Sequence, residues 1–433
     1  MKILIGVHHF PPRYSGGAEQ RALRTAAALQ QRNHQVKVIC VEHIDRGPTS
    51  GALWQEDNYQ GIIVRRLSFD LSAVPNRTIF EYNNPWIGEQ LELILRQENP
   101  DIFHLIGGYL LSASTLIAAR NQNTPSVVTL TDFWFICPRI TLQRSDGSLS
   151  TLPVNPETCA RCLGETSRRY RLPGKIFPSL MNAYWHKQTE KIRQIQTRLD
   201  FLKTVLNNTD RIIYPSKFLG DVFIQAGIES QRMTFSRQGH DFPELAPELL
   251  SKTPSLSLRL AYMGQIAQLK GIHVLIEAVK QLPNAQLKLS IYGDETPFPA
   301  YTQKLRQIAQ DDPRIEFAGR YQRQELTRIL QNVDVVIIPS LWYENSPNII
   351  LECFAHRTPV IASDLGGMAE LVKHNENGLL FSPGNPQSLA NQLQRLLDEP
   401  NLLSQLQTGI PPVKTLVQEI NELETIYTQI ARQ

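Results

Sequence analysis

Short apolar runs alternate with helix-like stretches along both halves of the chain, and this alternation constrains the fold more than any other feature. Strands are expected at 2–7, 36–41, 62–67, 102–106, 127–130 and 211–214, and again at 258–263, 287–292, 315–318, 333–338 and 360–362. Helices are expected at 18–32, 88–98, 272–281, 301–310, 324–331, 388–398 and 416–432. Such alternation is typical of parallel sheets with helices on both faces. It predicts two Rossmann-like α/β domains whose ligands lie beyond the carboxyl ends of the strands.

The length of 433 residues also favours two domains, because a single hydrophobic core stops growing at about 250–300 residues. Three prolines and several polar residues interrupt the alternation over 242–257, so the domain boundary is expected there.

Composition excludes several classes of protein. Apolar residues make up 42% and charged residues 20%, as in ordinary soluble proteins. A net charge of +3 without a basic tail argues against nucleic-acid binding. No run approaches the ~18 apolar residues of a membrane span, and the first residues favour a strand over a signal peptide. A cytoplasmic location is expected, and five cysteines fit a reducing compartment.

Two glutamates flank a Pro-Asn-hydrophobic run that follows a buried strand of the second half. We expect Glu344 in the loop and Glu352 on the following helix, with Ser346 or Asn345 as N-cap and Pro347 in the first turn. The N–H groups at such a helix start favour a diphosphate, and a carboxylate accepts hydrogen bonds from sugar hydroxyls. The alternative is two solvated glutamates at a strand–helix junction.

Two further loops follow the first strand of each half. Gly16 and Gly17 open a helix, and glycines there let backbone N–H groups approach a ligand. The dinucleotide pattern G-x-G-x-x-G is absent, and an ordinary turn is the alternative. In the second half, Lys270 could neutralise a diphosphate leaving group, or it is simply a surface lysine.

The Glu-x7-Glu spacing, the Gly-Gly-Ala-Glu segment at 16–19 and the Lys-Gly pair at 270–271 resemble retaining glycosyltransferases of family 4. The resemblance runs over nearly the whole chain. It implies the GT-B fold, with two Rossmann-like domains facing each other across a cleft. Residues 1–242 would form the acceptor-side domain, to which the helix at 413–433 returns. Residues 257–408 would bind the nucleotide-sugar donor.

The resemblance also assigns roles to individual residues. Glu352 would bind the ribose hydroxyls, and Glu344 would lie near the transferred sugar. Where the family usually has an arginine, this chain has Gln265, so Arg320 is a candidate to supply the missing charge. The implied donor-binding residues are Gly16, Gly17, Gln265, Lys270, Arg320, Asn345, Ser346, Pro347, Asn348, Ile349 and Glu352.

On the acceptor side, the resemblance points to Thr131 and Asp132, although family members often have a histidine where Thr131 stands. His104 ends a strand and is expected to line the cleft, or to be an ordinary strand histidine. The implied catalytic set is Glu344, Lys270 and His104, without a protein nucleophile. Leaving-group stabilisation and substrate alignment would then do most of the catalytic work.

Three cysteines allow an alternative metal site. Cys159 and Cys162 form a C-x2-C pair, and with Cys137 and a fourth ligand they could bind zinc tetrahedrally. In the resembled family a fourth cysteine stands near the position of Ser150. The alternative to this zinc site is three free or paired thiols. We expect no cofactor and no catalytic metal.

The stretch 168–198 is rich in lysine and arginine. It predicts either a core-packed helix with a solvated basic face or an element that contacts anionic lipid.

The expected function is retaining transfer of a sugar from a nucleotide-diphosphate sugar to a glycan or lipid-linked acceptor, in polysaccharide or glycolipid biosynthesis. The expected partners are this donor, this acceptor and the inner membrane face, but no nucleic acid. One alternative is a nucleotide-sugar epimerase of the same fold. The other is a catalytically silent protein that binds a nucleotide or a glycan.

Overall fold

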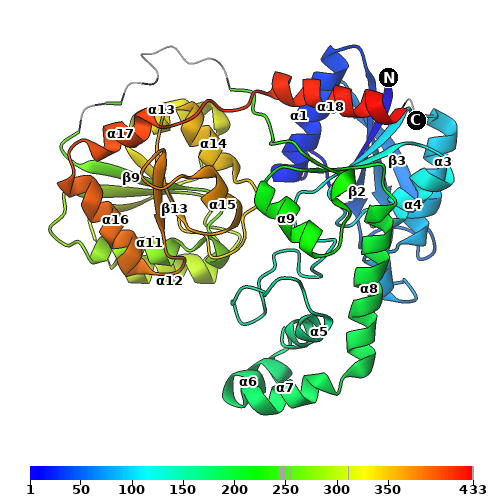
Figure 1. Cartoon of the computed structure of the whole chain (residues 1–433), viewed down its shortest axis with the longest axis horizontal. Helices are drawn as coiled ribbons and strands as arrows, with labels where there is room; N and C mark the ends of the chain where they lie inside the picture. The colour runs from blue at the N-terminus through cyan, green and yellow to red at the C-terminus, as the bar shows by residue number, and fades with distance from the viewer. Residues whose placement is uncertain (243–249, 251, 254, 311, 432–433) are drawn as a thin grey trace. The chain divides into compact units, whose positions relative to one another are not determined.

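The computed structural model describes residues 1–242, 250, 252–253, 255–310 and 312–431. The chain divides into two compact units (Figure 1). Unit 1 comprises Met1–Gln238 and Leu416–Gln433, and unit 2 comprises Gly239–Thr415. The division falls just before the boundary expected at 242–257, and much of that expected linker lies outside the described residues.

Unit 1 contains one eight-stranded sheet in the order β3-β4-β2-β1-β5-β6-β7-β8. Within the described residues, the strands of this sheet pair in parallel, except that β3 and β4 are antiparallel. Its strands are β1 Lys2–Val7, β2 Gln35–His43, β3 Leu53–Tyr59, β4 Ile62–Ser68, β5 Ile102–Ile106, β6 Ser126–Thr129, β7 Arg211–Tyr214 and β8 Met233–Phe235. The sequence did not predict the two edge strands. β3 is mostly polar and exposed, and β8 is only three residues long.

The helices of unit 1 cover this sheet and extend one arm from it (Figure 1). They are α1 Gly17–Gln31, α2 Arg77–Phe80, α3 Pro85–Glu98, α4 Ser114–Asn121, α5 Pro156–Gly164, α6 Arg168–Ile176, α7 Pro178–His186, α8 Thr189–Asn207, α9 Lys217–Gln225 and α18 Leu416–Ala431, with a 3-10 turn at Ser230–Arg232. We call the segment from α5 to α8, residues 156–207, the arm.

The last helix, α18, packs into the core of unit 1. Its Ile420, Leu423 and Tyr427 share a buried cluster with residues of α1, β1 and β2. Arg21 of α1 donates a hydrogen bond to Glu419 of α18 at 2.6 Å, and both side chains are almost fully buried. The end of the chain is therefore part of the N-terminal unit.

Unit 2 contains one six-stranded parallel sheet in the order β11-β10-β9-β12-β13-β14. Its strands are β9 Leu258–Met263, β10 Leu287–Tyr292, β11 Ile315–Gly319, β12 Val335–Ile338, β13 Val360–Ser363 and β14 Gly378–Phe381. Its helices are α11 Ile272–Lys280, α12 Pro299–Ala309, α13 Leu326–Gln331, α14 Asn348–Ala355, α15 Gly366–Leu371, α16 Pro386–Asp398 and α17 Leu402–Thr408, with 3-10 turns at Gln268–Lys270 and Arg323–Glu325.

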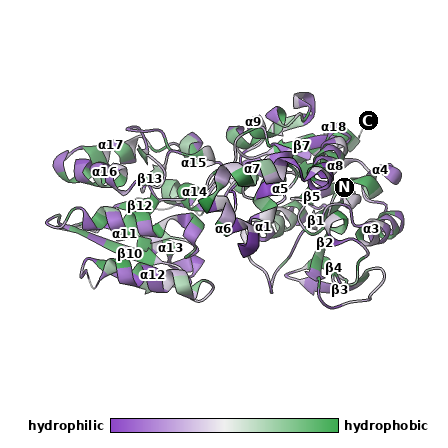
Figure 2. Cartoon of the chain, turned by 90° about the horizontal axis from the view of Figure 1, so that it is seen from below, coloured by the Kyte–Doolittle hydropathy of each residue, from purple (hydrophilic) through white to green (hydrophobic). Residues whose placement is uncertain are grey.

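Both faces of this sheet are buried, as parallel sheets require. Along β9, Leu260 and Tyr262 enter one core, whereas Ala261 and Met263 enter the core on the opposite face. Coloured by hydropathy, the strands are mostly hydrophobic (Figure 2). Helices therefore cover both faces of the sheet, and loops follow the carboxyl ends of the strands.

Candidate functional site

The loops after β9 and β12 meet at the carboxyl edge of the unit 2 sheet. Gly271 has φ +69, and a Cβ atom there would lie 1.9 Å from the carbonyl oxygen of Pro339. The Leu341 N–H donates to the Leu269 carbonyl at 2.7 Å. Only glycine allows this close approach of two backbones. The approach brings the residue before Gly271 next to the loop that precedes α14.

Lys270 and Glu344 form the centre of this site. The Nζ atom of Lys270 lies 2.5 Å from Oε1 of Glu344. The same oxygen accepts hydrogen bonds from Ser340 Oγ and Trp342 Nε1, each at 2.9 Å. Glu344 is buried, whereas the Lys270 side chain is 25% exposed and lies 5.4 Å from the Trp342 ring centroid. The carboxylate is thus held in place, and the ammonium remains accessible to a ligand.

The start of α14 differs from the expected cap. Its N-cap is Pro347, in extended conformation and without a side-chain cap bond, so the expectation of Ser346 or Asn345 as N-cap was wrong. Instead, Ser346 Oγ and Asn348 Oδ1 are buried and have no hydrogen-bond partner within the described chain. An unsatisfied buried polar atom calls for an explanation, and a bound ligand is one of them. A ligand hydroxyl at the helix start could donate to Asn348 Oδ1, and a hydroxyl or phosphate oxygen could accept from Ser346 Oγ.

The other donor-site candidates of unit 2 are divided between α14 and the loops after β9 and β11. Glu352 lies within α14, and Ile349 packs against the core of that face. Gln265 is exposed in side chain, and its carbonyl oxygen accepts a hydrogen bond from Tyr262 at 2.6 Å. Arg320 follows β11, which β10 separates from β9. Its side chain is 80% exposed and pairs with Asp294 at 3.4 Å, away from Lys270 in the sheet order.

In unit 1, Gly16 and Gly17 lie at the start of α1. Gly16 is the N-cap, and a Cβ atom there would lie 2.7 Å from Oε2 of Glu19. Glu19 is buried, and its Oε1 lies 3.2 Å from Nε2 of His8. Burial raises the pKa of Glu19, but the hydrogen bond and charge of His8 outweigh it and bring the pKa below its ordinary value. Gly16 thus makes room for a buried carboxylate.

Sequence reasoning missed a group of rings at this edge. The ring centroid of His8 lies 5.4 Å from that of His9 and 5.9 Å from that of Tyr109. His9 stacks on Tyr14 at 3.7 Å, and its Nδ1 lies 2.7 Å from the Val41 carbonyl oxygen. The signal was present, because two histidines directly follow the first strand. Polar rings at a carboxyl end of a parallel strand are candidates for ligand contact.

Thr131 and Asp132 follow β6 at the same edge. Thr131 Oγ1 donates to Asp132 Oδ2 at 3.1 Å, and the Trp134 N–H donates to Oδ1 at 2.8 Å. Burial raises the pKa of Asp132 even though both hydrogen bonds and the charge of His8 oppose this shift. The carboxyl group is therefore oriented by its own loop.

His104 does not line a cleft, which corrects the expectation from its place at a strand end. It is 1% exposed, its Nδ1 lies 2.6 Å from the Tyr427 hydroxyl and its Nε2 lies 2.8 Å from Thr129 Oγ1. Burial lowers its pKa to about 3. The reason is α18, which covers β5 and closes off the ring. His104 is a core residue and is removed from the catalytic candidates.

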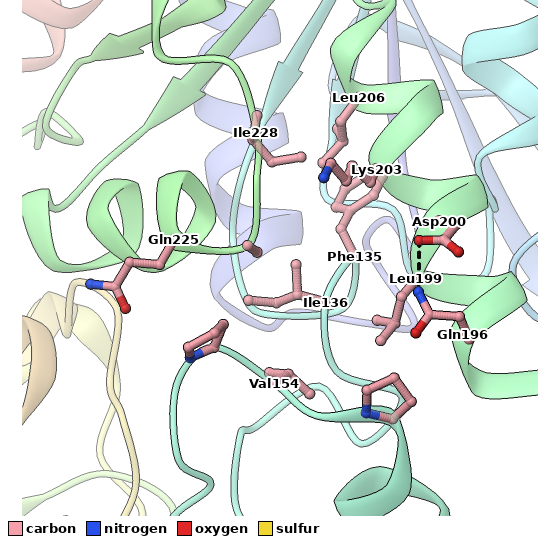
Figure 3. Close-up of a pocket in the computed structure, with 13 residues that line it drawn as sticks. Phe135, Ile136, Val154, Gln196, Leu199, Asp200, Lys203, Leu206, Gln225 and Ile228 are labelled. Atoms are coloured by element: carbon pink, nitrogen blue, oxygen red, sulfur yellow. Dashed lines mark hydrogen bonds between the residues drawn. The ribbon is translucent and has the colours of Figure 1, made fainter. Parts of the chain in front are cut away.

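Two of the cavities of unit 1 lie next to the loop that follows β6. One, of about 230 Å³, lies beyond the carboxyl ends of β2, β4, β5 and β6, and its lining includes Phe69, Arg77, Glu81, Tyr109, Trp134 and Arg198. The other, of about 190 Å³, lies between the loop after β6, α8 and the end of α9 (Figure 3). Its lining is mixed, with Ile136, Leu199 and Ile228 beside Lys203 and a Gln196–Asp200 hydrogen bond of 2.8 Å.

Cys137, Cys159 and Cys162 are buried free thiols that line one small cavity. Cys159 packs with Ala160 and Ile195 between α5 and α8. Burial raises the pKa of Cys159 to about 12, with Cys137 and Cys162 adding to the shift, and burial also raises the pKa of Cys162. In the described residues, no three His, Cys, Asp or Glu side chains are grouped to hold a metal ion. The zinc alternative therefore stays a prediction.

In the part of the chain that the structure describes, no helix combines the length and the apolar character that crossing a bilayer requires.

Solved structures share this fold. A glycosyltransferase from Rickettsia africae aligns over 100% of this chain and 99% of its own, with a TM-score of 0.66 and 17% identity. Anabaena HepE, crystallised with UDP and glucose, aligns over 99% of both chains, with a TM-score of 0.64 and 19% identity. The two parallel-sheet α/β units therefore have the GT-B architecture of glycosyltransferases.

The sequence profile of Glycosyltransferase Family 4 matches residues 15–241, and that of Glycosyl transferases group 1 matches residues 257–399. Because the first match alone covers more than half of the chain, the chain belongs to glycosyltransferase family 4.

Curated relatives match over shorter stretches. An uncharacterised glycosyltransferase of Methanocaldococcus jannaschii is 32% identical over 143 residues, which is 32% of this chain and 36% of the relative. A lipopolysaccharide core biosynthesis glycosyltransferase of Rhizobium meliloti is 32% identical over 158 residues, or 36% of this chain and 44% of the relative. The chain thus matches less than half of the length of each.

Proposed function

We propose that this protein transfers a sugar from a nucleotide-diphosphate sugar to a glycan or lipid-linked acceptor, with retention of the anomeric configuration. The observation that carries the proposal is the site at the start of α14. There the Lys270–Glu344 pair lies in the loops beside the helix start, and two buried polar atoms, Ser346 Oγ and Asn348 Oδ1, lack partners in the described chain.

The donor diphosphate would lie at this helix start. Backbone N–H groups and the positive end of the helix favour an anion there. The Lys270 ammonium would neutralise the charge that develops on the leaving diphosphate. Glu344 would orient the transferred sugar, and Glu352 on α14 would accept hydrogen bonds from ribose hydroxyls. The UDP and glucose bound in Anabaena HepE support a uridine donor.

The acceptor would bind in the cavity at the carboxyl edge of the unit 1 sheet. Tyr109 offers an aromatic surface and a hydroxyl, and Arg77 and Glu81 line the same cavity. Such a mixture of ring and hydrogen-bonding groups suits a sugar. Burial and then the charge of Glu81 raise the pKa of Tyr109, Arg77 opposes the shift, and the charge of Asp132 adds to it. The Rhizobium relative in lipopolysaccharide core biosynthesis supports a polysaccharide or glycolipid product.

The test is turnover of UDP-, GDP- and ADP-sugars with bacterial glycolipid and oligosaccharide fractions as acceptors, followed by proton NMR of the product. The expected result is acceptor-dependent nucleotide release and a product with the donor's anomeric configuration. An inverted product would contradict the retaining mechanism. Turnover of the donor without any acceptor would favour the epimerase alternative. Tight nucleotide binding without turnover would favour a silent binding protein.

A further inference from the structure

We propose that the end of the arm, residues 168–188, docks on a bilayer surface that contains anionic lipid. We call this segment the arm tip. It includes α6, α7 and the turn between them, and it lies at the end of α8 away from the sheet of unit 1 (Figure 1). The inference rests on the surface of the arm tip alone and does not depend on the proposed reaction.

Large apolar side chains gather at the arm tip. Elsewhere in the described residues, the exposed large apolar side chains are scattered along the sequence. Those of the arm tip, with their exposed fractions, are Leu172 47%, Ile176 64%, Phe177 56%, Leu180 68% and Tyr184 37%. Contiguous apolar exposure in a soluble protein marks a surface that contacts something else.

A packed scaffold holds these side chains outward. Trp185 is 1% exposed, and a Cβ atom at Gly164 of α5 would lie 1.9 Å from its ring. The ring centroid of Tyr170 lies 5.3 Å from that of Trp185 and 5.8 Å from that of Tyr184. The inner side of the tip is therefore closely packed against α5. The exposure of the outer side is a property of the fold.

The positive charge of the arm tip favours an anionic partner. It carries five basic residues and no aspartate or glutamate, and these basic residues are Arg168, Arg169, Arg171, Lys175 and Lys187. Cations around an apolar centre match a bilayer interface, where the apolar groups enter the acyl boundary and the basic groups contact anionic headgroups. Lysine and arginine can also lay their apolar stems along the surface while their charges stay in the headgroup layer.

The long basic helix α8 is a weaker candidate for this contact. Its Arg198 is buried and donates to the Trp134 carbonyl at 2.5 Å. Its Arg193 pairs with Glu190 of the same helix. The lipid contact that the sequence suggested for the region as a whole is therefore better placed on α6 and α7.

The experiment is vesicle sedimentation of the full chain, with phosphatidylcholine alone compared with equal parts of phosphatidylcholine and phosphatidylglycerol. The test variant is Ile176→Ser/Phe177→Ser/Leu180→Ser. The matched control, Leu53→Ser/Leu93→Ser/Val417→Ser, removes three exposed apolar side chains elsewhere on unit 1. A charge variant, Arg168→Gln/Arg169→Gln/Lys175→Gln, removes three cations from the tip.

We expect the wild type and the control to sediment with anionic vesicles and not with neutral ones. Both tip variants should bind at least about tenfold more weakly while keeping the wild-type Tm, since apolar burial and headgroup attraction act together. Equal sedimentation of the apolar tip variant and the control would overturn the proposal. The proposal would also be overturned if the wild type did not bind anionic vesicles at low salt but formed a dimer that the apolar tip variant abolishes. The apolar patch would then bind a second copy of the chain.

Discussion

The ion pair between α1 and α18 allows a quantitative test of how the end of the chain is held. Arg21 donates to Glu419 at 2.6 Å, and their side chains are 6% and 1% exposed. Removing one partner of a buried pair costs about 3–5 kcal/mol, because the remaining charge loses that favourable contact. For a unit of this size, each kcal/mol lowers Tm by roughly 2–4 °C. We therefore expect Arg21→Met to lower the Tm of unit 1 by about 6–20 °C.

The chain offers a matched control on the same two helices. Arg32, at the end of α1, pairs with Glu424 of α18 at 2.5 Å, but these side chains are 30% and 27% exposed. Such a solvated pair contributes about 0–1 kcal/mol, so Arg32→Met should lower Tm by no more than about 4 °C. The double variant Arg21→Met/Glu419→Leu should recover much of the loss, because apolar residues replace both charges.

The assay is differential scanning calorimetry of the full chain, with the unit 1 transition assigned from the variants. Equal Tm losses for Arg21→Met and Arg32→Met would refute the reasoning, since the buried pair would then contribute no more than the exposed one. A double variant as unstable as Arg21→Met would also refute it.

Two further predictions follow from buried backbone and side-chain contacts. His104 has a pKa of about 3 in the folded chain, below its unfolded value of about 6.5, so the unfolded chain binds more protons and stability falls as pH drops through this window. Between about pH 7 and about pH 5, the Tm of His104→Gln should therefore fall less than the Tm of the wild type. The difference corresponds to about 2 kcal/mol of unfolding free energy, and equal falls in Tm would contradict the prediction. Gly271→Ala places a Cβ atom 1.9 Å from the Pro339 carbonyl oxygen at φ +69. It should destabilise unit 2 by about 1–3 kcal/mol in calorimetry and weaken nucleotide binding, and an unchanged Tm would refute the close approach.

The central strands were predictable because each is an apolar run between turn signals. Strands such as β1, β5, β9 and β10 begin and end at the predicted residues. The strands that the prediction missed, β3, β8 and β14, lie at sheet edges. An edge strand pairs on one side only, so its sequence need not be continuously apolar, and β3 shows this with its polar residues. The reason differs for β14, which is buried but only four residues long.

The sequence named the candidate residues of the site but not the contacts between them. Lys270 and Glu344 could be named from their loops, but their contact joins positions 74 residues apart and depends on the backbone approach at Gly271. His104 shows the opposite failure. Its strand position suggested an accessible ring, and only the return of α18, with Tyr427 323 residues later, buries it. Local sequence cannot reveal which distant helix covers a strand end.

The cap of α14 shows a similar limit. Serine and asparagine favour N-cap positions, so Ser346 and Asn345 were natural predictions. In the structure Pro347 takes the cap, and the polar atoms Ser346 Oγ and Asn348 Oδ1 remain buried without partners in the described chain. The N-cap preference of serine and asparagine therefore did not decide the start of α14. On our proposal, a ligand completes the hydrogen bonding there.

The most direct test of the donor site is isothermal titration of UDP, GDP and ADP into the wild type, Lys270→Met and Lys288→Met. Lys288 is an exposed lysine of β10 in the same unit and serves as the control. We predict that one nucleotide binds the wild type and the control alike. We predict that it binds Lys270→Met about 10–100-fold more weakly, as the loss of a charged hydrogen bond implies. Equal affinity in all three proteins, or no binding of any nucleotide to the wild type, would contradict a donor site at the start of α14.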